Sequence, residues 1–320
     1  MNKWYCILAI WLVSSSVLWA QQENQYTQFM HYRQGINPAY AGNSGAVEFT
    51  GLVRSQWMGI EGSPQTQVLS FSMPAVNNRV GLGANILHQS IGVTNEYTLE
   101  TAYAYRFPVP RGFLGIGIMA SVRMLRVDFS ALQGTQPIGL DEAVPGDIQS
   151  KLVPNFGAGI YYSGQNFYFG ASLPRLLESN IDLSDGDGTI SRDVRHFYLM
   201  GGVELEVTDG LTLEPQLLLK FVAGAPLDMD LNVMGHFGDR FRTGLSFRLG
   251  GSTEGGFGES ASLLVGADIT EQLMLGLAYD MTLSQLRDFS SGSVEVVMRY
   301  YLKRKIETKP EEPDNPRFFD

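Results

Sequence analysis

Few residues in this sequence have a type and spacing that could support catalysis or metal binding. The four histidines are His31, His88, His196 and His236. None of them is spaced with another histidine, a cysteine or an acidic residue as a zinc motif requires. No serine lies in a Gly-x-Ser-x-Gly turn. We therefore expect no catalytic residue, no metal and no cofactor, although an envelope enzyme with scattered active-site residues stays open as a remote alternative.

Two glycine-rich segments resemble ligand-binding motifs but have simpler interpretations. Residues 115–120 match the loose dinucleotide fingerprint, yet no helical pattern follows them and the glycines continue a strand. Residues 182–188 look faintly like a calcium loop. In the best alignment Leu183 and Val194 occupy ligand positions, and neither side chain can bind calcium. We interpret this segment as a solvated external loop.

The composition narrows the class of protein. The chain has 320 residues, of which 44% are hydrophobic, 18% are charged and 36 are glycine. This much apolar sequence excludes a disordered chain. The formal net charge is -10, and no concentrated basic face is apparent, so nucleic acid is not an expected partner.

The first 20 residues have the features of a secretory signal peptide. Lys3 supplies the positive start, residues 4–19 are mainly apolar, and a polar run follows Ala20. A membrane anchor is the alternative, but this stretch is short and contains three serines. The only cysteine, Cys6, lies inside the signal, so the expected mature chain has none. No later stretch is apolar enough for a membrane helix, so a membrane-spanning form must be a closed barrel.

From about residue 47 the sequence breaks into segments of about ten residues with apolar side chains at every second position, as in membrane barrels. In segment 96–107 one face carries Tyr97, Leu99 and Tyr103 and the other carries Glu96, Glu100 and Arg106. A soluble sandwich also shows such alternation, but it does not require short and long connections to alternate strictly. The tight connections are 76–79, 108–112, 163–165, 208–210, 237–239 and 270–272, and the long ones include 128–151, 174–192, 250–259 and 281–292.

We therefore predict an all-β fold, a transmembrane antiparallel β-barrel of about 14 strands preceded by a signal peptide. The expected organisation is a signal peptide at 1–20, a periplasmic or lumen-plugging segment at 21–46, the outer-membrane barrel at 47–302 and a periplasmic acidic tail at 303–320. An even strand number places both termini in the periplasm. Pro215 lies inside the apolar segment 211–222 and should cause a bulge or imperfect pairing there.

The inward face of these segments carries charges and bare glycines. We expect the charges either to pair with one another or to line a solute path. Three Gly-x-Gly pairs, Gly81/Gly83, Gly115/Gly117 and Gly157/Gly159, leave backbone uncovered on one face, and we hypothesise that they make room for the N-terminal segment. The inward charges are Glu48, Arg54, Glu96, Glu100, Arg106, Glu214, Lys220, Asp230, Arg242, Arg248, Glu295 and Arg299.

Two compact motifs carry a resemblance to a known family. The first contains Asn37, Pro38, Ala39, Tyr40 and Gly42; the second contains Arg54, Gln56, Trp57, Gly59, Gly62, Pro64 and Thr66. In this spacing they resemble the NPAYAG-like and R-x-Q-W-x-G-x-x-G-x-P-x-T segments of the PorP/SprF family of outer-membrane proteins. Further likeness runs through most of the mature chain, but not through the tail after Leu302.

The resemblance implies an outer-membrane barrel that is an accessory of type IX secretion and gliding motility. It implies three kinds of partner: outer-membrane lipid, secretion components including the periplasmic ring, and a secreted surface protein, such as an adhesin, with a C-terminal sorting domain. A porin-like solute channel is the alternative function. We expect Trp57 in the outer aromatic girdle, and Arg54, Gln56 and Thr66 near the lumen mouth. The motif residues either dock a partner or form a rigid hairpin that closes the barrel.

Overall fold

The computed structural model describes residues 24–131, 147–181, 192–238, 240–250 and 258–302. Three short helices, η1 (Phe29–His31), α2 (Arg33–Ile36) and η2 (Pro38–Tyr40), precede the first strand. Two further 3-10 turns, η3 (Phe129–Ala131) and η5 (Gln285–Asp288), lie in connections. The strands are β1 (Glu48–Ser55), β2 (Gln65–Ala75), β3 (Val80–Ile91), β4 (Thr94–Val109), β5 (Gly112–Asp128), β6 (Ile148–Gly164), β7 (Phe167–Leu173), β8 (Ser179–Asn180), β9 (Arg192–Asp193), β10 (His196–Val203), β11 (Leu205–Thr208), β12 (Leu211–Val222), β13 (Asp228–Phe237), β14 (Phe241–Leu249), β15 (Ser260–Asp268), β16 (Leu273–Thr282) and β17 (Ser293–Tyr301).

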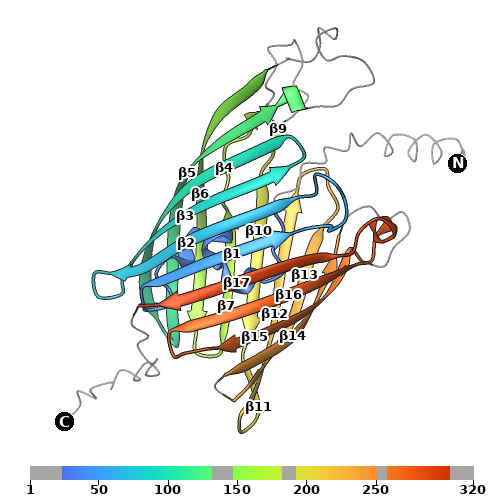
Figure 1. The fold of residues 1–320 in the computed structure, drawn as a ribbon. Helices are drawn as coiled ribbons and strands as arrows, with labels where there is room; N and C mark the ends of the chain where they lie inside the picture. Colours follow the sequence, from blue (N-terminus) through green and yellow to red (C-terminus); the bar gives the residue numbers. More distant parts are fainter. Residues whose placement is uncertain (1–23, 132–146, 182–191, 239, 251–257, 303–320) are drawn as a thin grey trace, which may run out of the picture.

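The strands form one closed antiparallel barrel (Figure 1). Sequential neighbours pair in hairpins, β1 pairs with β17, and β10 pairs with both β7 and β12. Since β10 and β11 are two halves of one strand, the barrel has 14 strands, which confirms the predicted fold class. The separate hairpin of β8 and β9 is not part of the barrel wall.

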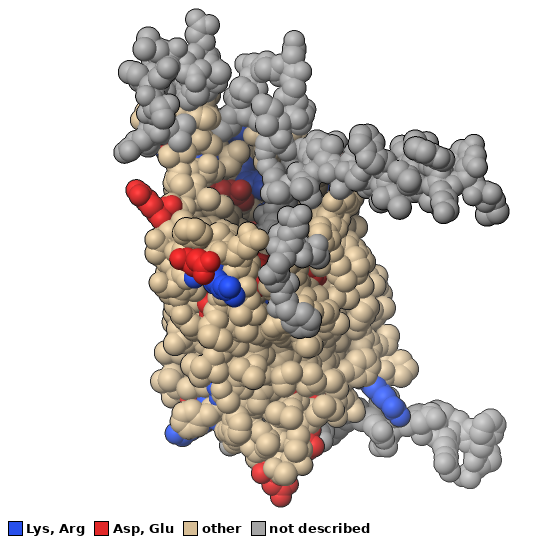
Figure 2. All heavy atoms as spheres, turned by 90° about the vertical axis from the view of Figure 1, so that its right-hand side faces the viewer, with Lys and Arg blue, Asp and Glu red and all other residues tan. Residues whose placement is uncertain are grey.

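Period-two alternation sorts the side chains between the two faces of the barrel wall. From Tyr97 to Tyr103 of β4 the odd-numbered residues, among them Leu99, are exposed and the even-numbered residues are buried. The outer surface therefore carries a belt of uncharged side chains, and the charged ones visible in Figure 2 lie towards the two ends. No helix in the described ranges is both long enough and apolar enough to span a membrane.

The two ends of the barrel differ in their connections. The tight connections that the sequence predicts all lie at one end, here called the turn end. The opposite end, here called the loop end, carries the longer connections, but it also has a two-residue turn at 92–93 and a five-residue connection at 223–227. The prediction that short and long connections alternate strictly is thus wrong at these two points. At 92–93 the reason is that β3 and β4 pair as far as Ile91 and Thr94, so two residues close the hairpin. β4, β5 and β6, with 16, 17 and 17 residues, continue beyond the rim of the shorter strands (Figure 1).

Pro215 explains the interruption between β10 and β11. On one side it pairs with Val233 of β13. On the other side the β10 ladder ends at Gln216 and the β11 ladder begins at Leu213, so the break lies opposite the residue that has no N–H to donate. The interrupted ladder agrees with the sequence prediction of imperfect pairing at Pro215. A separate register shift lies between Glu206 and Thr208, opposite Thr212 and Leu211.

Candidate functional site in the barrel lumen

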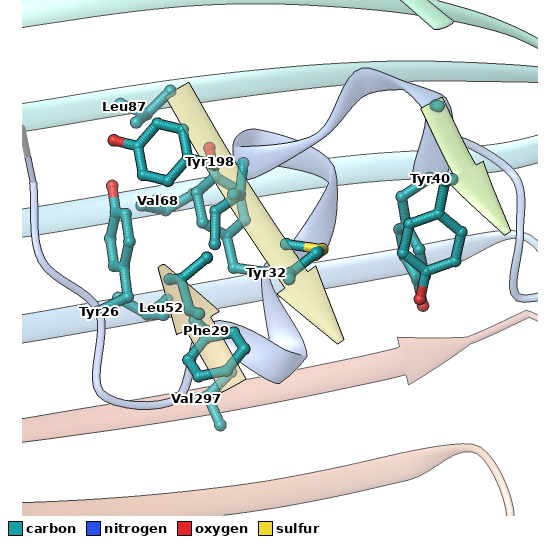
Figure 3. Packing of buried hydrophobic residues seen from close by; sticks show 14 of the residues in the cluster. Tyr26, Phe29, Tyr32, Tyr40, Leu52, Val68, Leu87, Tyr198 and Val297 are labelled. Carbon is teal, nitrogen blue, oxygen red and sulfur yellow. The ribbon is translucent and has the colours of Figure 1, made fainter. Parts of the chain in front are cut away.

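Residues 24–46, here called the lumen segment, lie inside the barrel (Figures 1 and 3). Its helices are only three or four residues long, because Asn37 and Pro38 end one turn and begin the next. Asn37 caps η2 by accepting a hydrogen bond from the Ala39 N–H at 3.0 Å. The segment is held by what surrounds it rather than by its own helices.

The largest apolar cluster of the described residues is formed between the lumen segment and the inner wall. Tyr26, Phe29, Tyr32 and Ile36 pack against apolar side chains from several strands (Figure 3). Those wall residues are Leu52, Val68, Leu87, Tyr161, Tyr198, Met200, Leu218, Met274 and Val297. The lumen therefore has a packed interior, to which the N-terminal segment contributes aromatic side chains.

Bare glycine backbone on the wall receives the lumen segment. A methyl group added at Gly81 would overlap the Ala41 carbonyl, and one added at Gly117 would overlap the Pro38–Ala39 backbone. Gly83, Gly115 and Gly159 likewise face Gln34, Ala39 and Asn37. The hypothesis that these glycines make room for the segment is confirmed at five positions. Gly157 is the exception, because its open side faces Pro174 of the connection after β7.

The first motif forms the contact with these glycines. The fully buried Asn37 donates from Nδ2 to the carbonyls of Ile160, at 2.8 Å, and Ala171, at 3.3 Å. Tyr40 meets Tyr161 edge-on with 5.3 Å between ring centroids.

Hydrogen bonds also hold the C-terminal end of the first motif. Gly42, at φ +66°, donates from its N–H to Ser72 Oγ at 2.8 Å, and a side chain at this position would collide with Met73. Arg106 Nη1 donates to the Ala41 carbonyl at 3.2 Å. The residue types of the motif are thus explained by their fit to the wall.

A buried ionic cluster holds the start of the lumen segment. Arg54 Nη2 lies 2.7 Å from Asp280 Oδ2, and its Nη1 lies 3.2 Å from Glu295 Oε2. The same Nη1 donates to Thr27 Oγ1 at 3.0 Å, and Thr27 Oγ1 donates to Asp280 Oδ2 at 2.8 Å.

The Glu295 carboxylate also accepts two backbone hydrogen bonds of the segment. The N–H of Thr27 donates to it at 2.9 Å and the N–H of Gln28 at 2.7 Å. Glu295 is completely buried. The cluster therefore joins β1, β16 and β17 to the lumen segment.

The rest of the second motif forms the loop between β1 and β2. The Gln56 N–H donates to the Pro64 carbonyl at 2.9 Å, and Thr66 pairs with Arg54 across the hairpin. Gly59 and Gly62 have φ values of +97° and +71°, and Gly62 packs against the turn at Gly92. A backbone pair between Met58 and the connection 283–292 joins this loop to its neighbour.

Trp57 follows β1 in the loop at the lumen mouth. Its backbone adopts φ +50°, its N–H donates to Ser293 Oγ at 3.1 Å, and the residue lines the loop-end cavity. The left-handed backbone takes the residue out of the regular strand, so its place in the aromatic girdle stays a prediction. Gln56 and Thr66 line the same cavity, as expected for the lumen mouth, whereas Arg54 lies deeper against Thr27.

The remaining inward charges are largely paired, as the first of the two sequence interpretations expects. Asp230 bonds Arg248 at 2.5 Å and Lys220 at 2.8 Å. Glu48 lies 3.0 Å from Arg299, and Arg123 contacts Glu96. Sequence reasoning missed Asp280, whose inward parity on β16 could have revealed it, and Thr27, which no periodic pattern marks.

Two cavities flank the lumen segment. The cavity at the turn end measures about 870 Å³ and has Met30, Arg33 and Tyr40 among its lining residues. The cavity at the loop end measures about 410 Å³ and is lined by Asn24, Trp57 and other residues. The two cavities share no lining residue. A third, small cavity of about 40 Å³ lies along Tyr26, Phe29 and Ile36 and shares Asn24 and Arg175 with the loop-end cavity. In the described residues the lumen segment thus contributes to the lining of all three cavities.

His31 is a buried histidine of the lumen segment. His31 Nδ1 lies 3.2 Å from Arg299 Nη1. Burial, together with the nearby Arg299, Arg242 and Arg33 guanidiniums and His236, holds the pKa of His31 well below its ordinary value. No group of three His, Cys, Asp or Glu side chains with metal-binding geometry occurs in the described ranges, and the calcium-like loop 182–188 lies outside them.

The two motifs do not converge on one site. The first lies along the glycines of β3 to β6, and the second surrounds the loop-end cavity. Arg54 of the second motif donates a hydrogen bond from the barrel wall to Thr27 of the lumen segment. The arrangement can hold a segment inside the lumen and can present a rigid rim.

Comparison with known proteins gives the following matches. The family model described as "Type IX secretion system membrane protein PorP/SprF" matches residues 18–300. No curated protein matches the chain.

Solved outer-membrane proteins are similar in fold. The Ralstonia pickettii toluene transporter TbuX has 11% identity and a TM-score of 0.50, over 83% of this chain and 92% of its own. The CymD monoaromatic hydrocarbon channel has 11% identity and a TM-score of 0.49, over 85% and 94%. Acinetobacter baumannii Omp33 has 8% identity and a TM-score of 0.48, over 80% and 97%. At such low identity, the likeness to TbuX shows the fold alone.

Proposed function

The chain belongs to the PorP/SprF family of type IX secretion system membrane proteins, and we propose that it assists the export or surface attachment of a client protein. The client is a secreted surface protein, such as an adhesin, with a C-terminal sorting domain. The role is that of a non-enzymatic accessory in the outer membrane, with both termini in the periplasm and with the periplasmic ring of the secretion system as a partner.

The observation that carries this proposal is the lumen segment between the two cavities. Asn37, Arg54 and Glu295 hold that segment by hydrogen bonds, most of them buried. The segment occupies part of the lumen that a solute path would use, whereas a protein partner can use the rims as they are. This favours a protein partner over the porin-like alternative.

We further propose that the client docks at the loop end, on the rim formed by the second motif. Trp57, Gln56 and Thr66 line the cavity there, and backbone hydrogen bonds join their loop to the connection 283–292. An aromatic side chain in a rigid, concave rim is a typical anchor point for a protein partner. The competing interpretation, a rigid hairpin that only closes the barrel, predicts no loss of display when Trp57 is truncated.

The test uses Trp57→Ala in the producing cell. We expect normal insertion of the barrel, measured by surface labelling and by the heat-dependent gel mobility of folded barrels, together with loss of the client from the cell surface. Arg287→Ala is the matched control, because Arg287 is exposed in the neighbouring connection and does not line the cavity. Normal client display by Trp57→Ala would contradict the docking role.

Arg54→Ala cannot make this distinction. Arg54 bonds Thr27 of the lumen segment, so its loss disturbs the interior as well as the rim. The solute-channel alternative is tested separately, by conductance of the purified barrel in planar bilayers. Steady conductance of the unmodified protein would favour that alternative.

A further inference from the structure

The turn-end cavity has the size and chemistry of a binding site. Its volume of about 870 Å³ lies within the range of ligand pockets in proteins. The side of the lumen segment that carries Met30, Arg33 and Tyr40 contributes to its lining. Aromatic side chains from the wall surround it: Tyr161, Phe167, Tyr168, Phe241 and Tyr301.

Four arginines, Arg33, Arg240, Arg242 and Arg299, line this cavity. Three of them each contact one wall carboxylate: Arg33 bonds Glu214 at 3.2 Å, Arg299 bonds Glu48 at 3.0 Å, and Arg242 bonds Asp268. A guanidinium has five N–H donors, so one carboxylate contact leaves donors for a second acceptor. Arg33 Nη1 also donates to Tyr161 Oη, Arg299 Nη1 lies beside His31, and Glu204, Asp268 and Glu271 line the same cavity. The lining is therefore mixed in charge, with guanidinium N–H donors for the carboxylates of a ligand and aromatic faces for its rings.

The chain leaves the barrel beside this cavity. Tyr301 lines it, and the Leu302 N–H donates to the Val47 carbonyl at the same end at 2.9 Å. Residues 303–320 follow Leu302 and lie outside the described part. Eighteen residues extend to at most about 60 Å, which is ample to turn back into a cavity that begins at Tyr301.

The sequence of this tail matches the cavity in chemistry. Residues 310–320 contain four acidic residues, including the last residue Asp320, against one cation, Arg317. They also contain the adjacent aromatic residues Phe318 and Phe319. This combination of carboxylates and aromatic rings is what the arginines and tyrosines of the cavity can bind.

We propose that residues 310–320 dock in the turn-end cavity of their own barrel. Phe318 and Phe319 pack against the aromatic wall, and the acidic side chains of the tail face the arginines. Because the tail is tethered at the rim, its effective concentration is in the millimolar range, so even a weak contact keeps it bound for much of the time.

The test measures disulfide formation within one chain. The chain without residues 1–20 has no cysteine, so introduced cysteines are the only ones present. Phe319→Cys is combined with Asn166→Cys, which lines the turn-end cavity. The reach-matched control combines Phe319→Cys with Asp209→Cys, an exposed position in another turn of the same end that does not line the cavity. A second control uses Gln89→Cys, in the loop-end cavity.

We expect the Asn166 pair to oxidise at least about tenfold faster than the Asp209 pair, and the Gln89 pair not to react. High salt should narrow the difference, because it screens the carboxylate contacts. Equal rates for the Asn166 and Asp209 pairs would overturn the proposal. If the Asn166 variant fails to fold, Ser44→Cys repeats the measurement from the lumen segment. This test does not depend on secretion of a client protein, so a negative result would refute the docking of the tail and leave the proposed function unaffected.

Discussion

Removal of the Arg54 guanidinium should release the start of the lumen segment before the barrel unfolds. In Arg54→Ala, the buried Glu295 and Asp280 side chains lose the cation that contacts both. The Thr27 hydroxyl also loses its bond to the guanidinium. The strands themselves keep their ladders, so the strain falls on the segment that these side chains hold.

The size of the effect follows from the burial of the cluster. Breaking a buried ion pair by removing one partner costs about 3–5 kcal/mol, since the other charge is left without compensation. If this cost falls on the docked state of residues 24–28, the equilibrium between docked and released segment shifts by about two to three and a half orders of magnitude. A matched surface pair, Arg195 with Glu178 at 3.7 Å, is partly exposed, and its loss should cost at most about 1 kcal/mol.

The chain offers a built-in reporter for this experiment. Without residues 1–20 it contains a single tryptophan, Trp57, which lines the same cavity as Asn24 and Gln25. The refolded barrel is titrated with urea while Trp57 fluorescence is recorded, and heat-dependent gel mobility measures the state of the barrel. We expect Arg54→Ala to show an early fluorescence transition with the barrel still folded, and Arg195→Ala to behave like the unmodified chain.

Two results would refute this reasoning. The first is an Arg54→Ala fluorescence transition within about 1 kcal/mol of the unmodified chain, which would mean that the cluster does not hold the segment. The second is loss of the barrel itself in the same transition, which would mean that the segment and the wall unfold as one unit. In either case Arg54 would need another explanation.

Other perturbations of the lumen give further expected outcomes. Gly117→Val should displace the Pro38–Ala39 turn, which lowers the free energy of unfolding by about 1–3 kcal/mol and raises bilayer conductance. Gly51→Ala is the control: nothing lies nearer than 4.0 Å to the added atom, so neither the stability nor the conductance should change. Because the pKa of His31 is lowered, the folded chain binds a proton at His31 less readily than the unfolded chain does, so stability should fall as the pH drops below 6.5 towards the folded pKa. Urea titrations from pH 7 to 5.5 measure this dependence. If His31→Gln shows the same slope of unfolding free energy against pH, the expectation is contradicted. Pro215→Val should restore a hydrogen-bond donor opposite the gap between β10 and β11 and so slow amide hydrogen exchange near Glu204. Unchanged exchange would mean that the proline does not cause the gap.

The sequence determines the barrel wall because a strand exposes alternate residues to opposite sides. The segment 96–107 has the same outward and inward sets in β4 as in the prediction, and all six tight connections fall between strands at the turn end. Short-range patterns of period two and the residues of tight turns carry this information, so it can be obtained without any knowledge of distant contacts. The pairing of Pro215 follows from the same local rule.

Only the tertiary structure decides what fills the lumen. Thr27 meets Asp280 and Glu295 across 253 and 268 residues of sequence, a contact that exists only because β1 closes on β17. The lumen segment has no periodicity, so nothing local indicates which of its faces meets which strand. The glycine pairs indicate that space is available, but not that Ala41 and Ala39 occupy it. Trp57 illustrates the same limit, because its left-handed backbone just after β1 and its hydrogen bond to Ser293 depend on the neighbouring strand β17.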